Sequence, residues 1–401
     1  MTSQVAIFNL NGIAVASDTV STSRSDKGSK TTNNAEKIYP LGEGHLVVAL
    51  HFGGTGLNDL NHQFHFNRWR ESLGKPLPTL EDYLNDYVEW STKNRLHSDE
   101  SENVEVIAII YDHVEELLRR TQKDIENASS ENAPANFTDF LFQRLSFHTK
   151  AGLDYLKELP KIKGITLESA KQTIADRKID VKKVFFDAAK QFWAFDNLIK
   201  LPANIAKLLS QSASLSLTVD QPLFWDSSLV FVGYGTKESF GSSIQVRVRS
   251  IIDNRLIYSR GEVQTIEPGR GQSRISAFAQ SDAINSFVQG YNWDIMSEVT
   301  WAIRNRGREV LPDAITDEYL EKIADATQEY IEGHSWKFYI SPMLNQIASM
   351  NLFSMSELAR TLVGLQATSS EAKDGPASVG GLIEVLTIDR TNGVQWRSKL
   401  P

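Results

Sequence analysis

The threonine directly after the initiator methionine has the most distinctive chemical potential in this 401-residue chain. Methionine before a small residue is commonly removed after synthesis, which would leave Thr2 with a hydroxyl and a free α-amine. An α-amine has an ordinary pKa of about 7.7–8.0, near the pH at which a general base works best. It can take the proton from the Thr2 hydroxyl, directly or through one water, and activate an otherwise weak nucleophile. Because Met-Thr also begins many proteins without catalytic meaning, the following residues decide the interpretation.

The residues after Thr2 predict a β-hairpin that ends in a carboxylate. Apolar runs at 5–8 and 13–16 flank the pair Asn11-Gly12. This pair favours a tight turn because both residues tolerate the positive φ that such turns need. The second run leads into Asp18, so the hairpin carries an acid at its far end and Thr2 at its free end.

The register of this hairpin decides whether Asp18 and Thr2 share a strand face. A strict two-residue loop at Asn11-Gly12 pairs Asp18 with Val5 and puts it on the face opposite Thr2. A three-residue loop with a bulge pairs Asp18 with Gln4 and restores the shared face. Both loops are compatible with the sequence.

Further residues follow the hairpin in an order that resembles the opening of proteasome β-type subunits, which are N-terminal-nucleophile (Ntn) hydrolases. A polar run at 19–34 is followed by a lysine before an apolar residue, a strand at 46–50 and a glycine pair. The family has a threonine, a strand, a glycine turn, a strand ending in aspartate, a polar loop, a lysine, a strand and a glycine. The positions that fall on this pattern are Thr2, Gly12, Asp18, Lys37 and Gly53.

The resemblance implies a role for each matched residue. Thr2 would be the nucleophile and, through its amine, the base. Lys37 would favour the alkoxide-like state of the hydroxyl, and Asp18 would hold Lys37 in place and keep it charged. The backbone N–H of Gly53 would stabilise the oxyanion, and Thr22 would help to pair with an extended peptide substrate. The ordinary alternative for Lys37 and Asp18 is a solvated surface pair.

The composition excludes several classes of protein. A net charge of −8 and a pI near 5.6 argue against general nucleic-acid binding, which needs a basic surface. The absence of cysteine excludes disulfides, thiolate zinc sites and a cysteine nucleophile. No stretch of about 18 apolar residues and no signal-peptide pattern is present, so we expect a cytoplasmic protein without a membrane partner.

Two helices are expected after Gly53, at 55–73 and at 79–95, with Thr79 as the cap of the second. His62 and His65, with His51 nearby, could bind a metal in principle. No acidic ligand accompanies them at the expected spacing, so we predict packing histidines, no metal site and no cofactor.

The middle of the chain is predicted to be helical. Residues 104–111 (VEVIAIIY) are typical of a buried strand. From 112 to 226, helical periodicity recurs at 114–125, 138–159, 167–175 and 181–198. We interpret this region as an insertion of four to six helices. It could be a packed decoration, a lid over the Thr2 cleft or a docking surface.

The β pattern resumes in the last third of the chain. Strands are expected at 229–233, 244–248, 255–259 and 262–266, and a helix at 276–290. Proteasome-type subunits place a supporting serine at the start of this helix, and Ser281 is the nearest candidate, although a helix-cap role fits it equally well. They also close with an aspartate, a spacer, a serine, glycines and two strands, which Asp374 and Ser378 match. The resemblance implies that both bond around the Thr2 amine and hydroxyl, whereas a turn before a hairpin is the alternative.

The predicted architecture is an α+β, four-layer αββα Ntn-hydrolase sandwich of two antiparallel sheets with an inserted helical subdomain. Its parts are residues 1–111 and 227–401 for the core and 112–226 for the insertion. The resemblance implies a threonine-type peptidase that forms an acyl-enzyme on Thr2, with a peptide or protein substrate, a homo-oligomer and a partner such as an unfoldase. The alternative is a non-catalytic assembly or binding subunit, because fold does not determine function; a weaker third is an amidase for a small substrate.

Overall fold

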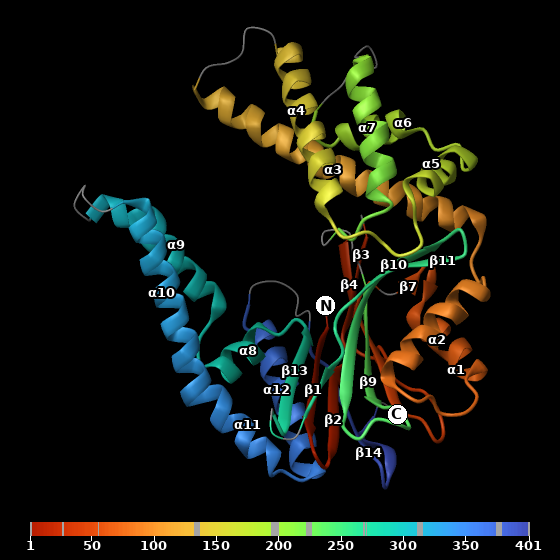
Figure 1. Ribbon diagram of the computed structural model, residues 1–401, viewed down its shortest axis with the longest axis vertical. Coiled ribbons are helices and arrows are strands. Elements are labelled where there is room, and N and C mark those ends of the chain that lie inside the picture. The colour runs from red at the N-terminus through yellow and green to blue at the C-terminus, as the bar shows by residue number, and fades with distance from the viewer. Residues whose placement is uncertain are drawn as a thin grey trace.

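The structure is a computed structural model of a mixed α+β chain with antiparallel sheets (Figure 1). It describes residues 2–25, 28–54, 56–131, 137–193, 200–221, 227–267, 269, 271–310, 316–373 and 379–399. Within this part of the chain, no helix has the length and apolar character needed to cross a membrane.

Two sheets form the body, and every strand pairing described in them is antiparallel. The first sheet has the order β13 (Ser273–Ala279), β1 (Ser3–Asn9), β2 (Gly12–Asp18), β14 (Ile383–Asp389), β15 (Gly393–Ser398). The second has the order β11 (Arg255–Arg260), β10 (Ser242–Ile252), β9 (Ser227–Tyr234), β6 (Leu46–Gly53), β5 (Ile38–Pro40), with β12 (Gln264–Thr265) paired to β10. Two short hairpins complete the strands: β3 (Ser21–Ser25) with β4 (Gly28–Thr32), and β7 (Gly56–Leu57) with β8 (Leu60–Asn61).

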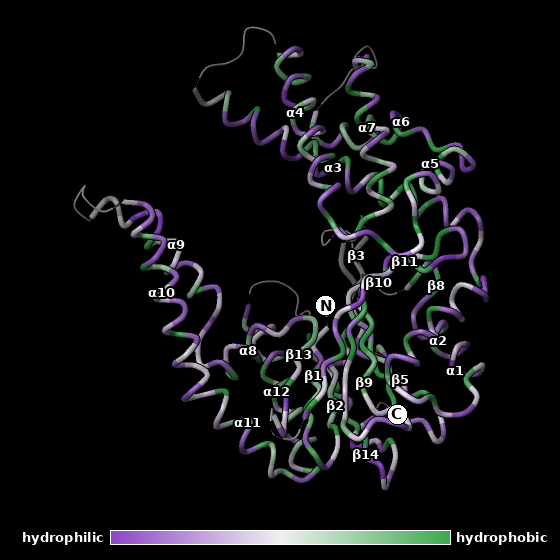
Figure 2. Tube along the Cα trace, viewed as in Figure 1, coloured by the Kyte–Doolittle hydropathy of each residue, from purple (hydrophilic) through white to green (hydrophobic). Residues whose placement is uncertain are grey.

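The sheets pack against each other through alternate side chains of their strands. Phe8 and Ile13 from the first sheet share one buried cluster with Val48 and Val230 from the second. Successive side chains of a strand point to opposite faces, so the remaining apolar residues of β1 and β2 face outward onto helices. Figure 2 shows how hydrophobic the central strands are along their length. Burial of both faces explains why the apolar residues of β1 and β2 form continuous runs, at 5–8 and 13–16, rather than alternating with polar residues.

Helices cover the outer face of each sheet. On the first sheet, α12 (Leu352–Glu371) packs across β1, β2 and β14, with α8 (Asp282–Gln289) and α11 (Ser341–Ala348) beside it. On the second sheet, α1 (His62–Ser72) and α2 (Leu80–Lys93) pack through large aromatic side chains. Thr79 caps α2 and forms a reciprocal capping box with Asp82, which confirms the predicted start of this helix.

The middle of the chain forms a separate helical cluster, seen at the top of Figure 1. It consists of α3 (Asp99–Glu131), α4 (Phe137–Glu158), α5 (Leu167–Asp176), α6 (Val181–Ala189) and α7 (Ala203–Ser216). The predicted strand at 104–111 is wrong, because these residues lie inside α3. Val106, Ile110 and Val114 are buried at helical spacing, whereas Val104 and Ile107 are exposed. Burial in this segment therefore repeats about every 3.6 residues, as in a helix, although the largely apolar sequence does not show this period.

The last third contains a helical arm, which Figure 1 shows extending away from the sheets. It is made of α9 (Trp293–Val310) and α10 (Asp317–Ser335), and α10 continues through a π-helical turn, η2 (Trp336–Ile340), into α11. The helix predicted at 276–290 is partly wrong, because its first residues belong to the edge strand β13. The helix α8 begins only at Asp282.

Candidate active site

The hairpin at the start of the chain adopts neither of the two loops considered from the sequence. Gln4 pairs with Ser17 and Asn9 pairs with Gly12, so the turn residues are Leu10 and Asn11. Gly12 is instead the first residue of β2, where an added Cβ would lie 2.6 Å from the carbonyl oxygen of Ile388 on β14. The glycine is therefore needed for close approach of a neighbouring strand.

This register places Asp18 at the end of β2, where four N–H donors surround its buried carboxylate. Oδ1 accepts hydrogen bonds from the backbone N–H of Ser3 (2.9 Å) and from Lys37 Nζ (2.7 Å). Oδ2 accepts from the backbone N–H groups of Val20 (3.3 Å) and Gly380 (3.2 Å). The carboxylate thus joins the residue after Thr2, the lysine that precedes β5 and the segment before β14 at one point.

Lys37 forms a buried ion pair with Asp18, and the side chains are only 3% and 0% exposed. This exposure excludes the solvated surface pair. Nζ donates to Asp18 Oδ1 and, at 2.6 Å, to the carbonyl oxygen of Val20. Burial lowers the pKa of Lys37, while the Asp18 carboxylate and the charge of Glu384 oppose this shift. An ammonium has three N–H donors, so one remains beyond these two bonds.

Gln4 fastens the strand of Thr2 to the second sheet. Its Nε2 donates to the carbonyl oxygens of His51 (3.0 Å) and Lys37 (3.5 Å) and to the hydroxyl of Ser17 (3.3 Å). The N–H of His51 also donates to the Lys37 carbonyl, at 3.3 Å. Gln4 was not among the predicted site residues. A buried amide at an inward position of an otherwise apolar strand was the signal for it.

Glu384 is a second residue that the sequence analysis missed. It lies opposite Ser17 on β14, is fully buried, and its charge acts on Lys37. Gln4, Ser17 and Glu384 therefore form one polar row across three neighbouring strands. The available signal was an acid within the otherwise apolar first half of β14, IEVL in the sequence IEVLTID.

Thr2 is two residues before Gln4, so alternation along the strand puts it on the same face as Gln4, which contacts the second sheet at His51. It is 7% exposed. Its carbonyl oxygen accepts a hydrogen bond from the N–H of Gln280 at 2.9 Å. The neighbouring Ala279 has a φ of +62°, a conformation that costs a residue with a Cβ about 1–2 kcal/mol. Such strain clusters at functional sites, and here it sets the N–H that holds Thr2.

The other predicted site residues differ in how closely they approach this point. Gly53 ends β6 with a φ of +87°, two residues after the His51 carbonyl that Gln4 binds. Ser281 follows the Gln280 that contacts Thr2, but its hydroxyl accepts a bond from Asn285 at the start of α8. Its position supports a helix-start role at least as well as a catalytic one.

Three predicted features fall wholly or partly outside the described residues. Thr22 belongs to the backbone of β3, and its side chain is not described. Asp374 and Ser378 also lie outside the described residues, as does Met1. Gly380, two residues after Ser378, is described, and its backbone N–H donates to Asp18.

The three histidines considered as metal ligands are buried within the protein. His51 and His62 lie side by side with ring centroids 5.1 Å apart, whereas His65 contacts Trp90. Burial lowers the pKa of His51 to about 3 and of His65 to about 4. In the described part of the chain, no group of three or more metal-binding side chains is present.

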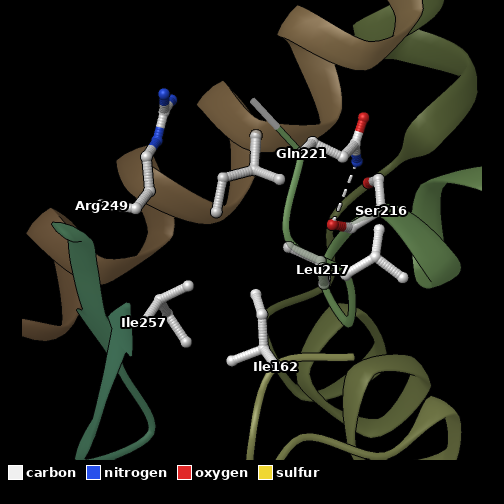
Figure 3. A pocket seen from close by; sticks show the side chains of 8 residues that line it. Ile162, Ser216, Leu217, Gln221, Arg249 and Ile257 are labelled. Atoms are coloured by element: carbon white, nitrogen blue, oxygen red, sulfur yellow. Dashed lines mark hydrogen bonds between the residues drawn. The ribbon is translucent and has the colours of Figure 1, made fainter. Parts of the chain in front are cut away.

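A small cavity lies elsewhere, where α3 and α7 meet the β10–β11 hairpin (Figure 3). Its volume of about 20 Å³ suits a single water. Figure 3 shows Ile162, Leu217 and Ile257 around it, and the amide of Gln221 reaching the Ser216 carbonyl. None of the predicted site residues lines it.

Comparison with known proteins identifies no family model and no curated protein that matches this chain. The geometry around Thr2, Asp18 and Lys37 therefore has to support any functional assignment by itself.

Proposed function

We propose that this chain is a threonine-type amide hydrolase that acts on peptides and has a four-layer αββα Ntn-hydrolase architecture. The face-to-face sheets and the helices on both outer faces support this architecture. The Asp18–Lys37 pair lies next to the start of β1, where Asp18 binds the N–H of Ser3. This position supports Thr2 as the nucleophile.

The buried Asp18–Lys37 pair is the observation that carries the proposal. Two charges withdrawn from water need good geometry and further hydrogen bonds to be tolerated. Here the carboxylate also binds the N–H of Ser3, and therefore sets the backbone beside Thr2. The ammonium keeps one N–H beyond its bonds to Asp18 and Val20. This arrangement suits the stabilisation of negative charge on a neighbouring oxygen.

The proposed reaction has two stages. The Thr2 hydroxyl oxygen attacks the amide carbon while the Thr2 amine, freed by loss of Met1, takes the hydroxyl proton. The oxyanion is stabilised by the N–H of Gly53 and by the Lys37 ammonium. The carbon–nitrogen bond then breaks, and the leaving amine receives the proton, which gives an ester on Thr2. Water, deprotonated by the same amine, attacks this ester and releases the acid and the hydroxyl.

The test combines intact mass with two variants of one residue. Purified protein should begin at Thr2, and a peptidyl vinyl sulfone should add one equivalent of mass at that residue. Thr2→Ala should abolish both the adduct and hydrolysis of a fluorogenic peptide library. Thr2→Ser, which keeps the hydroxyl and the amine, should retain both. Equal hydrolysis by Thr2→Ala would reject the mechanism.

A non-catalytic assembly or binding subunit is the second candidate, and the low exposure of Thr2 favours it. A residue that is 7% exposed must gain access before a substrate can reach it. The arm also presents large exposed side chains such as Tyr330 (74%) and Trp336 (57%). Retention of Met1 in the intact mass, with no adduct, would support this candidate over hydrolysis.

A further inference from the structure

A polar groove runs along the edge of the first sheet, beside β13. Its larger part has a volume of about 960 Å³ and lies between β12, the start of β13 and the η2–α11 segment. A second part of about 200 Å³ lies against β10 and β11. The two parts share Gln264, and the second is lined by Phe278. Ser273 and Arg274, at the start of β13, line the larger part, and Phe278, near the end of this strand, lines the smaller part.

Arg274 lines the larger part of the groove, and its guanidinium is mostly buried. Its nitrogens donate to the hydroxyls of Ser276 (2.9 Å) and Ser243 (2.5 Å), and its carbon lies 4.6 Å from the centre of the Phe8 ring. Among the described residues, no carboxylate pairs with it. Burial alone lowers the pKa of Arg274 to about 10. A guanidinium withdrawn from water without a counter-ion has capacity for a planar anion.

The surroundings of Arg274 suit a peptide-like ligand with one negative charge. Thr265, Gln272 and Asn345 supply hydroxyl and amide groups, and the exposed ring of Trp336 supplies an apolar surface. Among the described residues that line the larger part, Glu267 is the acidic one, and it interacts with another group of the protein.

The strand register connects this groove with Thr2. Arg274 pairs with Phe8, and Phe278 pairs with Gln4. Gln4 is two residues after Thr2 and therefore lies on the same strand face. From Arg274 to Gln280, which bonds Thr2, six strand steps cover about 20 Å at about 3.4 Å each. An extended peptide of about six residues spans the same distance.

We propose that Arg274 binds the C-terminal carboxylate of a short peptide that lies along β13 with its scissile amide at Thr2. This inference rests on the proposed function for its cleavage step, but not for its binding step. The substrate class is then oligopeptides with a free C-terminus close to the cleaved bond. Folded proteins are excluded from it, and peptides blocked at the C-terminus lose the contact with Arg274.

The experiment measures binding without turnover, in the Thr2→Ala background of the full chain. Immobilised protein is exposed to equimolar pools of random N-acetyl hexapeptides, one with free C-termini and one with C-terminal amides, and retained peptides are identified by mass spectrometry. We expect about 10-fold enrichment of acids over amides, a loss of this ratio in Arg274→Gln, and a smaller ratio in Arg274→Lys, which keeps the charge without the fork. Absence of hydrolysis by the chain that retains Thr2, with the enrichment present in Thr2→Ala, would reject only the catalytic proposal.

The matched control is Arg397→Gln. Arg397 lies on β15 at the opposite edge of the same sheet and, like Arg274, donates to a hydroxyl, that of Thr387. Its replacement should leave the acid preference unchanged. Melting temperatures of all variants show whether they fold. Equal retention of acids and amides by the parent, unchanged preference in a folded Arg274→Gln, or displacement of the acids by inorganic phosphate at equal concentration would each overturn the proposal.

Discussion

Two buried carboxylates, Asp18 near Thr2 and Glu102 in α3, are paired with cations in different ways. Glu102 is 1% exposed and accepts from His97 Nε2 at 2.8 Å, from Arg177, and from the N–H of Asp253 at 3.0 Å. Arg177 also bonds Asn103 and Asp253. This network fastens the helical cluster to the β10–β11 turn. The Asp18–Lys37 pair instead fastens the beginning of the chain to the beginning of β5.

The difference shows that a buried ion pair alone does not mark an active site. In the Glu102 network, the cation bonds to several acceptors that belong to the scaffold, so its role is structural. At Asp18, the carboxylate that holds the cation also accepts from the N–H of Ser3, directly after the one residue that combines a hydroxyl with a potential α-amine. What separates the two is location rather than spare donor capacity, because the Nε of Arg177 also lacks a hydrogen-bond partner among the described residues. Four predictions test this distinction.

The largest effect is expected for Lys37→Met. Removing the ammonium should lower peptide hydrolysis about 10³-fold, because a preorganised charge at the oxyanion is lost. The unpaired Asp18 should also destabilise the fold by about 3–5 kcal/mol. Hydrolysis of a fluorogenic peptide and urea unfolding measure the two effects.

The double variant Asp18→Asn/Lys37→Met separates these effects. Asparagine keeps one acceptor, for the N–H of Ser3 or for the N–H groups of Val20 and Gly380, without leaving a buried charge. Stability should return in part while hydrolysis remains lost. Recovery of hydrolysis would show that the pair is structural, like the Glu102 network.

Arg177→Met makes the corresponding change in the helical cluster. It removes the main cation from buried Glu102 and should lower the free energy of unfolding by about 3 kcal/mol. Peptide hydrolysis at a temperature where the variant is folded should stay within about 2-fold of the parent. A loss of activity comparable to that of Lys37→Met would erase the distinction between the two networks.

Acid should lower the stability of the fold, because histidines near the candidate site bind protons more readily in the unfolded state. The folded-state pKa of His51 is about 3, below the ordinary 6.5, so between these values the unfolded state binds the extra proton. Stability therefore rises with pH through this window and falls on acidification. From pH 6.5 to pH 5, His51 alone should cost roughly 2 kcal/mol. Urea unfolding of His51→Phe should show a correspondingly flatter pH profile, and an unchanged profile would contradict the assignment.

The smallest effect is expected for Ala279→Gly, which relieves a positive φ beside Thr2. The relief of about 1–2 kcal/mol is partly offset by glycine's entropy cost of about 0.5–1 kcal/mol, leaving a small gain in stability. Lys178→Gly is the matched control, because Lys178 has a φ of +53° after α5. Both should raise the urea midpoint, but only Ala279→Gly should change hydrolysis, by about 2- to 5-fold. Equal activity in both variants would mean that this strain has no catalytic role.

Local patterns in the sequence predicted the elements whose causes are local. The apolar runs around the first hairpin, the Thr79 cap and the strands predicted at 229–233, 244–248 and 255–259 appear where short-range rules put them. The run at 104–111 misled because a short apolar stretch suits a strand and a helix equally well. The packing of this segment against α6 and α7 decided in favour of a helix.

The sequence by itself determined which chemical groups exist: a hydroxyl at residue 2, an acid at 18, a lysine at 37, and no thiol. Only the tertiary structure decided that Asp18 and Lys37 meet, and that Gln4 and Glu384 join them. Strand register depends on the neighbouring strands, and β14 lies more than 360 residues from β2 in the chain, as the Gly380–Asp18 bond with its separation of 362 shows. Contacts at such separations leave no local pattern, because they are selected by the burial of whole sheets.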